Sequence, residues 1–324
     1  MAVMVQSSGN FQKLVGLYEG AILEYWQDKY ANASKDAGIP LLFDSVQSDN
    51  ATESISEMVG AVDFKEWNGE FTYGNIKEGG VKTFTPIVFQ AGMKYDRFLL
   101  SNAKLINLKT EHGMFALGAA RTRKECAGGI FTYADQAAGY TVNGVPLLWN
   151  IVANGQPIAS NAQTSANYGT AQDNLEALEL TEENLETVCQ KLFDVCDENG
   201  KRAGMSPNLL VVPTALRKKA LEIVGSTGKS DTGDNNANVY DGNIKVLVWD
   251  QFRRQTGKTG QPWCVCDLEA AKESLKIINR LETGDEYELI SWKTESDQVW
   301  TIGSLMWYAM GAFSWHPFQF SIPA

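Results

Sequence analysis

The sequence predicts an α+β fold from which one long β-hairpin projects. Three observations support this prediction. Apolar residues recur at helical spacing over 11–30 and again over 104–127, strand-forming residues fill 81–89, and short apolar runs dominate the chain beyond residue 208. The chain has 324 residues, which is enough for one large domain or two smaller ones.

Composition and charge argue against several classes of protein. The chain is 44% apolar and 21% charged, as is typical of a globular protein in water. Its net charge of −11 disfavours a broad basic surface that grips nucleic acid. Five scattered cysteines, an odd number, favour a reducing compartment over a disulfide framework. The start of the chain shows no basic segment followed by an apolar run, so we expect no secretory signal.

The first helix is expected over residues 11–30, where apolar side chains follow one another at three- and four-residue steps. The breaker Gly38–Ile39–Pro40 follows it. Residues 1–58 are therefore expected to form an arm that precedes the compact core. A second, longer helix is expected over 104–127, and Gly128–Gly129 can end it.

The stretch from Trp67 to Leu100 is expected to form the long β-hairpin. Its outgoing arm would end near residue 73, and its return arm would cover 81–89. The polar tip would lie at Glu78–Gly79–Gly80, since adjacent glycines supply the positive φ that a reversal needs. A two-stranded ribbon is marginally stable alone in water, so it should lie on a neighbouring copy. The expected intersubunit contacts are its aromatic residues Trp67, Phe71, Tyr73, Phe84 and Phe89.

The clearest helix in the sequence begins after Thr181, a suitable N-cap that Glu182 and Glu183 follow in the first turn. Asn199–Gly200 is the expected stop. Buried strands should follow, and the last third of the chain is strand-rich. The expected strands cover 208–213, 244–248, 263–267, 275–279, 286–292 and 299–309.

Residues 299–324 contain no Asp, Glu, Lys or Arg, which raises the possibility of a membrane span. The tract nevertheless contains Pro317 and Pro323 together with several polar residues. Trp300 and Ile302 alternate with small or polar neighbours. This pattern favours buried strands, and we expect no contact with a membrane.

Two stretches imitate phosphate-binding loops, at residues 225–230 and 257–259. The motif requires a glycine where the chain has Ile223 in the first case and Phe252 in the second. Residues 234–245 similarly imitate a calcium loop but lack its glycine and its closing carboxylate, so we expect a solvated loop, with weak cation binding as the minor alternative.

The remaining chemistry-bearing residues are isolated in the sequence. Cys264 and Cys266 share one face of an expected strand, but no second pair completes a zinc set. His112 and His316 have no nucleophile nearby in the sequence, and no catalytic motif is present. We therefore predict no catalytic residue, no cofactor site and no metal site.

The order of the elements resembles that of tailed-bacteriophage (Caudoviricetes) major capsid proteins with the Hong Kong 97-type fold. Specific stretches are similar to the major head subunit family of phage Mu and Mu-like prophages. One departure is Trp149–Asn150, where that family has His-Pro. The similar stretches, in order, are Phe64–Gly69, Leu117–Ala120, Val142–Leu148, Leu178–Glu186, Leu209–Pro213, Asn238–Gly242 and Trp263.

The resemblance implies a domain organisation. Residues 1–58 would be an N-terminal arm and 59–103 an extended loop, both reaching over neighbours. Residues 104–179 would form a peripheral domain with a long spine helix, and 180–289 an axial domain. Residues 290–324 would supply the closing strands of the peripheral domain.

The resemblance also implies a structural protein with no catalytic role. Such a subunit assembles as hexamers and pentamers into an icosahedral shell around double-stranded phage DNA, which it encloses without specific binding. The implied partners are further copies of the chain and scaffold, portal and decoration proteins. The implied location is the virion, after assembly in the cytoplasm of the host bacterium.

Two alternatives remain open at this point. The chain could be an encapsulin-like shell protein of a cellular nanocompartment, which genes for a cargo enzyme beside it would indicate. It could instead be an α+β enzyme, which a stable monomer in solution would favour.

The phosphate-loop imitations lead to a first prediction. Because Ile223 and Phe252 replace the required glycines, Lys229→Ala and Lys258→Ala should leave assembly unchanged. Electron microscopy of each variant measures this, and an ATP-binding titration is the control. Saturable binding by the wild type that either substitution removes would contradict the prediction.

Overall fold

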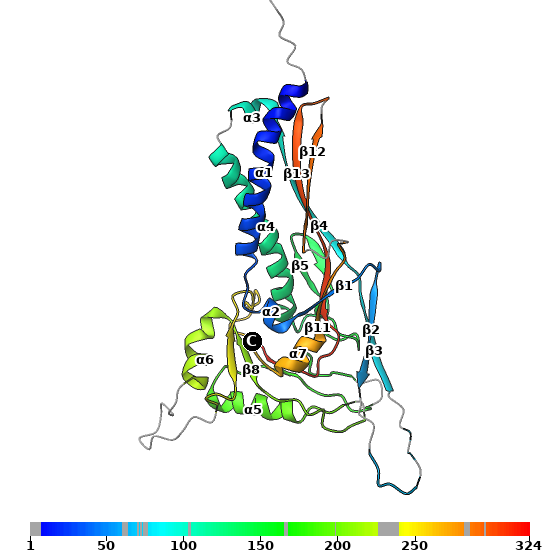
Figure 1. Ribbon diagram of the computed structural model, residues 1–324. Coiled ribbons are helices and arrows are strands. Elements are labelled where there is room, and N and C mark those ends of the chain that lie inside the picture. Colours follow the sequence, from blue (N-terminus) through cyan, green and yellow to red (C-terminus); the bar gives the residue numbers. More distant parts are fainter. Residues whose placement is uncertain are drawn as a thin grey trace, which may run out of the picture.

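The computed structural model describes residues 8–59, 64–69, 71, 73, 77–102, 105–164, 168–197, 199–225, 240–281, 286–294 and 296–324. The subunit is long and tapers from a broad base to a narrow upper part (Figure 1). Helices and strands occur together in both parts, as the sequence predicts.

The narrow part packs long helices lengthwise on a mixed sheet (Figure 1). The strand order is β1-β11-β13-β12, and β4 pairs with β13 on the side opposite β12. Helices α1 and α4 lie side by side along this sheet. The long helix α1 (Ser8–Ala33), the short α3 (Arg97–Asn102) and the long α4 (Leu105–Thr132) belong to this part. Helices α2 (Ile39–Leu42) and α7 (Leu268–Ser274) contact each other near the lower end of the sheet, where the subunit broadens (Figure 1). The sheet of the narrow part consists of β1 (Asp44–Gln47), β4 (Ile87–Asp96), β11 (Leu275–Asn279), β12 (Glu288–Thr294) and β13 (Val299–Ala312), and the short hairpin β5 (Tyr140–Val142) and β6 (Val145–Leu147) lies beside α4.

The broad part contains a second sheet, in the order β7-β14-β10-β8-β9. Thr181 caps α5 by accepting a hydrogen bond from the backbone N–H of Asn184, as predicted. The helix ends at Phe193, earlier than expected, because the chain turns and pairs Cys196 with Arg202. The elements are β7 (Leu175–Glu176), α5 (Glu182–Phe193), β8 (Leu209–Val212), α6 (Arg217–Val224), β9 (Lys245–Val248), β10 (Trp263–Cys266) and β14 (Phe318–Ser321).

The predicted N-terminal arm is in large part a core helix of its own subunit. Trp26 is fully buried and stacks on Tyr30 at 5.2 Å between ring centroids. Glu19 of α1 forms an ion pair with Lys293 of β12 at 2.8 Å. Since α1 buries its apolar face against α4 and the sheet, residues 8–33 pack on the body of their own subunit.

Gly128–Gly129 does not end the spine helix, which continues to Thr132. An added Cβ at Gly128 would lie 2.4 Å from Cβ of Gln251, and one at Gly129 would lie 2.2 Å from the Tyr140 ring. The two glycines therefore allow neighbouring segments to approach the helix closely. Their role in packing explains why the expectation of a helix end was wrong.

The predicted hairpin from Trp67 to Leu100 is replaced by two separate pairings. Strand β3 (Lys77–Phe84) pairs with β2 (Glu53–Val59), from Glu53 opposite Phe84 to Val59 opposite Lys77. These strands are the β2–β3 ribbon. Strand β4 begins after Pro86 and pairs with β13 instead. Pro86 lacks an N–H, so a continuous ladder is disfavoured there.

The glycines expected at the hairpin tip lie inside β3. An added Cβ at Gly80 would lie 2.4 Å from the carbonyl oxygen of Ala153. At Gly79 it would lie 3.1 Å from the carbonyl oxygen of Glu57. Close approach of backbone, rather than chain reversal, therefore requires these glycines.

The uncharged tract at residues 299–324 forms β13 and β14, as predicted, and nearly all of it is buried. In the described part of the chain, no helix is long and apolar enough to cross a membrane. The two sheets do not follow the expected boundary at residue 289. Strand β11 precedes it but pairs with β13, and β14 follows it but pairs with β10.

The buried glycines of α4 lead to a second prediction. Gly128→Ala and Gly129→Ala should each lower the free energy of unfolding by about 1–3 kcal/mol, because the new methyl overpacks the contact. Gly118→Ala is the matched control in the same helix, where an added Cβ meets nothing within 4 Å. It should raise stability by up to about 1 kcal/mol through helix propensity. Urea denaturation measures all three, and equal effects would contradict the packing role.

Candidate subunit-contact surfaces

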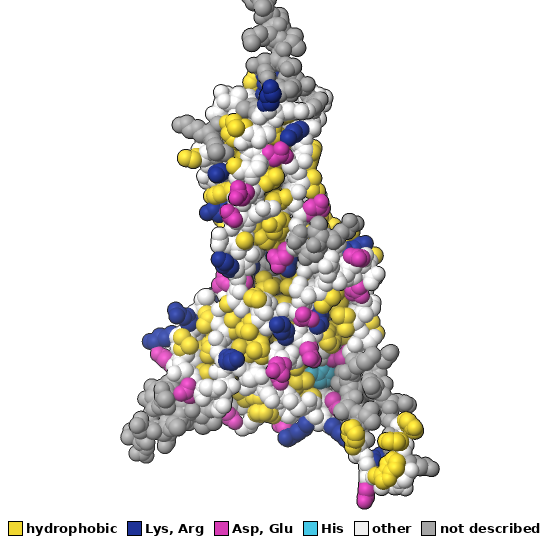
Figure 2. Space-filling view, in the orientation of Figure 1, with side chains coloured by type: hydrophobic (Ala, Val, Ile, Leu, Met, Phe, Trp, Pro, Cys, Tyr) yellow, Lys and Arg dark blue, Asp and Glu magenta, His cyan; other side chains and the backbone are white. Residues whose placement is uncertain are grey.

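A cluster of exposed aromatic side chains lies on the loop beyond the β2–β3 ribbon. We call it the aromatic loop, with Phe64, Trp67, Phe71 and Tyr73 as its members. Their exposed fractions are 102%, 64%, 76% and 90%. Figure 2 shows hydrophobic side chains gathered where this loop projects at the lower right. So much exposed aromatic surface on one projecting segment is a feature of binding sites.

The rings of Trp67 and Phe71 contact each other edge to face, with 5.1 Å between their centroids. The two rings form one local apolar cluster on the loop. Neither ring is buried by this contact alone, since both remain more than half exposed. Three of the five predicted contact residues, Trp67, Phe71 and Tyr73, are thus available to a neighbouring molecule.

The other two predicted contact residues belong to the core of the subunit. Phe84 on β3 is only 2% exposed. Phe89 on β4 is also buried, and it stacks on Tyr308 at 5.3 Å. Both side chains are buried in their own subunit, so the expectation that they face a neighbour is wrong. That expectation took residues 81–89 to be one free arm of a hairpin. Strand β13, which covers Phe89, lies more than 200 residues away in the sequence.

Two contacts hold the base of the ribbon to the body. The first joins Glu57 of β2 to His316, with 3.1 Å between Oε1 and Nδ1 and both side chains buried. The hydroxyl of Ser314 lies 2.8 Å from the same ring nitrogen. The ring also stacks on Trp315. Glu57 and Ser314 both lie against Nδ1 of His316, whereas a proton relay needs a partner on each ring nitrogen. We therefore interpret this cluster as a structural anchor.

The second contact involves Lys82 of β3. Its Nζ donates to the backbone carbonyls of Leu148 at 3.1 Å and Ile151 at 2.5 Å. Burial lowers the pKa of Lys82 from its ordinary value near 10.5 to about 8, since the charged amine is costly away from water. Sequence reasoning missed both anchors, because no local pattern joins β2 or β3 to residues 148–151 and 314–316.

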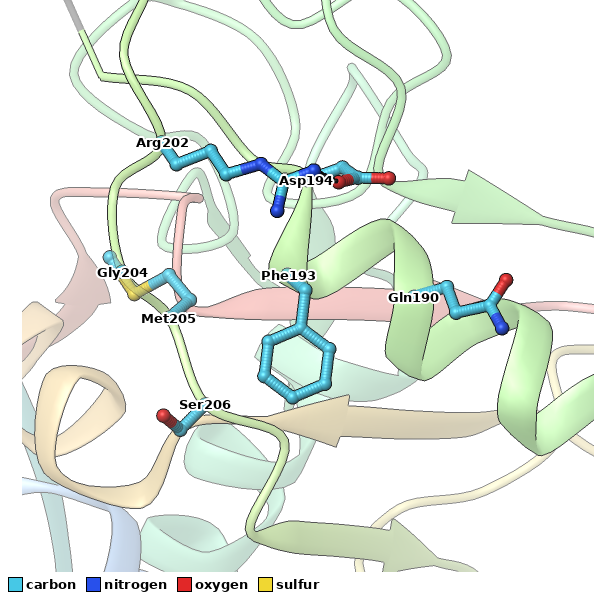
Figure 3. Close-up of a pocket in the computed structure, with 7 residues that line it drawn as sticks. All are labelled: Gln190, Phe193, Asp194, Arg202, Gly204, Met205 and Ser206. Carbon is cyan, nitrogen blue, oxygen red and sulfur yellow. Dashed lines mark hydrogen bonds and ion pairs between the residues drawn. The ribbon is translucent and has the colours of Figure 1, made fainter.

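A pocket in the broad part shows no arrangement of groups for catalysis. It has a volume of about 510 Å³ and lies where α5 ends (Figure 3). Figure 3 shows Arg202 and Asp194 paired at its rim, and their side chains lie 2.6 Å apart. Phe193 is half-exposed there. Across the described residues, no group of three or more His, Cys, Asp or Glu side chains could hold a metal ion.

The remaining candidate residues are structural where they are described. His112 is buried and stacks on Tyr95, and its Nδ1 lies 3.0 Å from the carbonyl oxygen of Leu108. Cys264 and Cys266 are buried in the central strand β10. Phe252 packs on Phe131 in the core, so the second phosphate-loop imitation has a core aromatic where glycine is required. Residues 226–230 of the first imitation and 234–239 of the calcium-like loop lie outside the described residues.

The shifted pKa of Lys82 leads to a third prediction. Between about pH 8 and pH 10.5, the Lys82 amine is protonated in the unfolded chain and deprotonated in the folded chain. Folding stability should therefore rise with pH over this range. Relative to Lys82→Met, the wild type should gain about 1–3 kcal/mol of unfolding free energy from pH 8 to 10. Chemical denaturation across this range measures the difference. The exposed Lys94→Met variant controls for the loss of one positive charge, and a pH-independent difference would contradict the prediction.

A family model described as the Mu-like prophage major head subunit gpT matches residues 159–252. No curated protein sequence matches the chain. The matched region begins before β7 and ends after β9, and therefore includes the N-capped α5 and the buried β8.

Solved structures show the same fold over more of the chain. The capsid of bacteriophage JBD30, decorated with minor capsid protein trimers, is 15% identical with a TM-score of 0.54, and the match covers 69% of this chain and 93% of that one. A chain of Microbacterium phage Oxtober96 is 11% identical with a TM-score of 0.52, over 90% and 92% of the two chains. A chain of Mycobacterium phage Patience is 10% identical with a TM-score of 0.52, over 96% and 88%.

At these identities the structures share the fold, and the family match adds the resemblance in sequence. The chain has the Hong Kong 97-type fold of tailed-phage major capsid proteins and is similar to the Mu-like major head subunit over residues 159–252.

Proposed function

We propose that this chain is the major capsid subunit of a tailed bacteriophage and has a structural role without catalysis. The observation that carries the proposal is the match of residues 159–252 to a major head subunit, within a chain that shares the fold of phage structures over most of its length. The encapsulin-like alternative is not favoured, because the matched family is a prophage head subunit.

In the proposed shell, hexamers and pentamers are built from contacts between copies of this chain. The narrow part, with α4 as its spine, would serve as the peripheral domain, and the broad part would serve as the axial domain near the capsomer centre. The β2–β3 ribbon and the aromatic loop would serve as the extended loop. Three exposed aromatic residues of the loop support this role for it.

The net charge of −11 suits a container for DNA, since a protein with an excess of negative charge does not bind phosphates tightly. We propose that the shell encloses double-stranded DNA without specific binding. Scaffold, portal and decoration proteins are proposed as further partners. Assembly would take place in the cytoplasm of the host bacterium, and the finished protein would lie in the virion.

The aromatic loop would be a main source of affinity between subunits. Burial of each such side chain contributes about 1.5–3 kcal/mol. The isolated subunit gains none of this, because Trp67, Phe71 and Tyr73 remain exposed. The loop should therefore contribute little to the fold and much to assembly.

This leads to a fourth prediction. The triple variant Trp67→Ser, Phe71→Ser, Tyr73→Ser should fold with wild-type thermal stability, because the three side chains are exposed in the subunit. It should fail to close into shells. Circular dichroism and thermal unfolding report on the fold, and negative-stain microscopy with sedimentation velocity reports on assembly.

Phe84→Ala is the matched control from the base of the ribbon. Because Phe84 is buried, its truncation should cost about 3–5 kcal/mol of stability. Shells of the triple variant at the wild-type yield would refute the assembly role of the loop. A wild-type protein that remains monomeric under all assembly conditions would refute the capsid proposal itself.

A further inference from the structure

The anchor between Glu57 and His316 joins two ionisable side chains that are both withdrawn from water. Their side chains are 5% and 4% exposed, and 3.1 Å separates Oε1 of Glu57 from Nδ1 of His316. Glu57 belongs to the β2–β3 ribbon, and His316 belongs to the turn between β13 and β14 in the body of the subunit. The anchor therefore connects ribbon and body through groups whose charges depend on pH.

The ribbon has an irregularity that makes room for the Glu57 carboxylate. Its register shifts at this point, where the single residue Glu57 of β2 lies opposite both Gly79 and Gly80 of β3. A β-bulge of this kind re-aims a side chain. An added Cβ at Gly79 would lie 3.4 Å from Oε2 of Glu57 and 3.1 Å from its carbonyl oxygen. The glycine thus leaves the space that the buried carboxylate needs.

A proton on the His316 ring is compensated by Glu57. Among the described residues, neither side chain forms another ion pair. Nδ1 also lies 2.8 Å from the hydroxyl of Ser314, and Nε2 is buried with no hydrogen-bond partner in the described part of the chain. One face of the ring lies on Trp315, with 4.2 Å between the ring centroids. A positive charge on this ring therefore depends on a single carboxylate.

The other charged groups near the base of the ribbon are engaged elsewhere. Lys82 of β3 donates to two backbone carbonyls, and its pKa of about 8 keeps it protonated throughout the acid range. Glu53 of β2 accepts hydrogen bonds from Ser48 and Asn50. Asp267 contacts Pro317 through its backbone N–H, while its carboxylate caps α7.

Acid removes the attraction across the anchor. A carboxylate accepts hydrogen bonds and cannot donate them, so Nδ1 carries the shared proton when Glu57 is ionised. With both groups charged, the attraction is strong because little water screens it. Once Glu57 is protonated, a buried imidazolium remains without a counter-charge, which costs free energy.

We propose that the Glu57–His316 pair is an acid-sensitive anchor, which holds the β2–β3 ribbon on the body near neutral pH and releases it when Glu57 takes up a proton. The aromatic loop lies beyond the ribbon, so proton uptake at the anchor changes how firmly the loop is held in one direction. The inference goes beyond the proposed function, because the anchor lies within one subunit.

Hydrogen exchange of the unassembled subunit tests the proposal. A two-stranded ribbon is marginally stable alone in water, so its release should expose the amides of β2 and β3. From about pH 7 to about pH 4, we expect their protection to fall at least tenfold, after correction for intrinsic exchange with an unstructured peptide. The amides of β8 and β10 in the same sample are the internal control and should keep their protection.

Two variants identify the groups that are responsible. His316→Gln leaves the Glu57 carboxylate buried without a cation, so acid should now increase the protection of the ribbon. The double variant Glu57→Gln with His316→Gln should show no selective pH dependence, and it should fold, since neutral replacement of a buried ion pair is often tolerated. Glu19→Gln is the matched control, which breaks the ion pair with Lys293 outside the ribbon and should behave like the wild type.

The wild-type measurement by itself can overturn the proposal, because ribbon protection that follows β8 and β10 across the pH range would exclude release. A double variant that keeps the wild-type pH dependence, or His316→Gln with an unchanged sign, would also overturn it by showing that other groups respond to acid. None of these results depends on shell formation. Failure of the anchor would therefore leave the capsid proposal untouched, and failure to form shells would leave the anchor standing.

Discussion

The structure depends most on β13, a strand of 14 residues that is buried along nearly its whole length. Its first ten residues pair with β4, and its last five pair with β11. Strand β12 pairs with its upper half on the other side. A strand with partners on both edges and side chains buried on its faces must be apolar and uncharged, which explains the composition of the C-terminal tract.

The position of β13 also connects the two parts of the subunit. After Ala312 the chain passes through Ser314 and His316 and enters β14, which lies in the second sheet beside β10. The turn between these strands carries the residues that hold Glu57. The ribbon is therefore held at the junction of the two sheets.

Burial divides the aromatic residues around the ribbon into two groups with different roles. Phe84 and Phe89 stabilise the subunit, since both lie in its core. Trp67, Phe71 and Tyr73 remain in water, and their burial would stabilise an assembly instead. In the proposed shell, this separation would allow a subunit to fold first and to assemble later, because the two processes would use different side chains.

The sequence by itself determined the local elements, because their signals are local. Helical spacing placed α1 and α4, the Thr181 cap placed the start of α5, and the uncharged tract identified buried strands. It also determined that the phosphate-loop imitations lack glycine. Only the tertiary structure decided which strands pair. It therefore also decided that Gly79–Gly80 and Gly128–Gly129 allow close packing, and do not form a turn and a helix end. It likewise decided that Phe84 and Phe89 are buried, since their covering partners are distant in sequence and no local pattern encodes that contact.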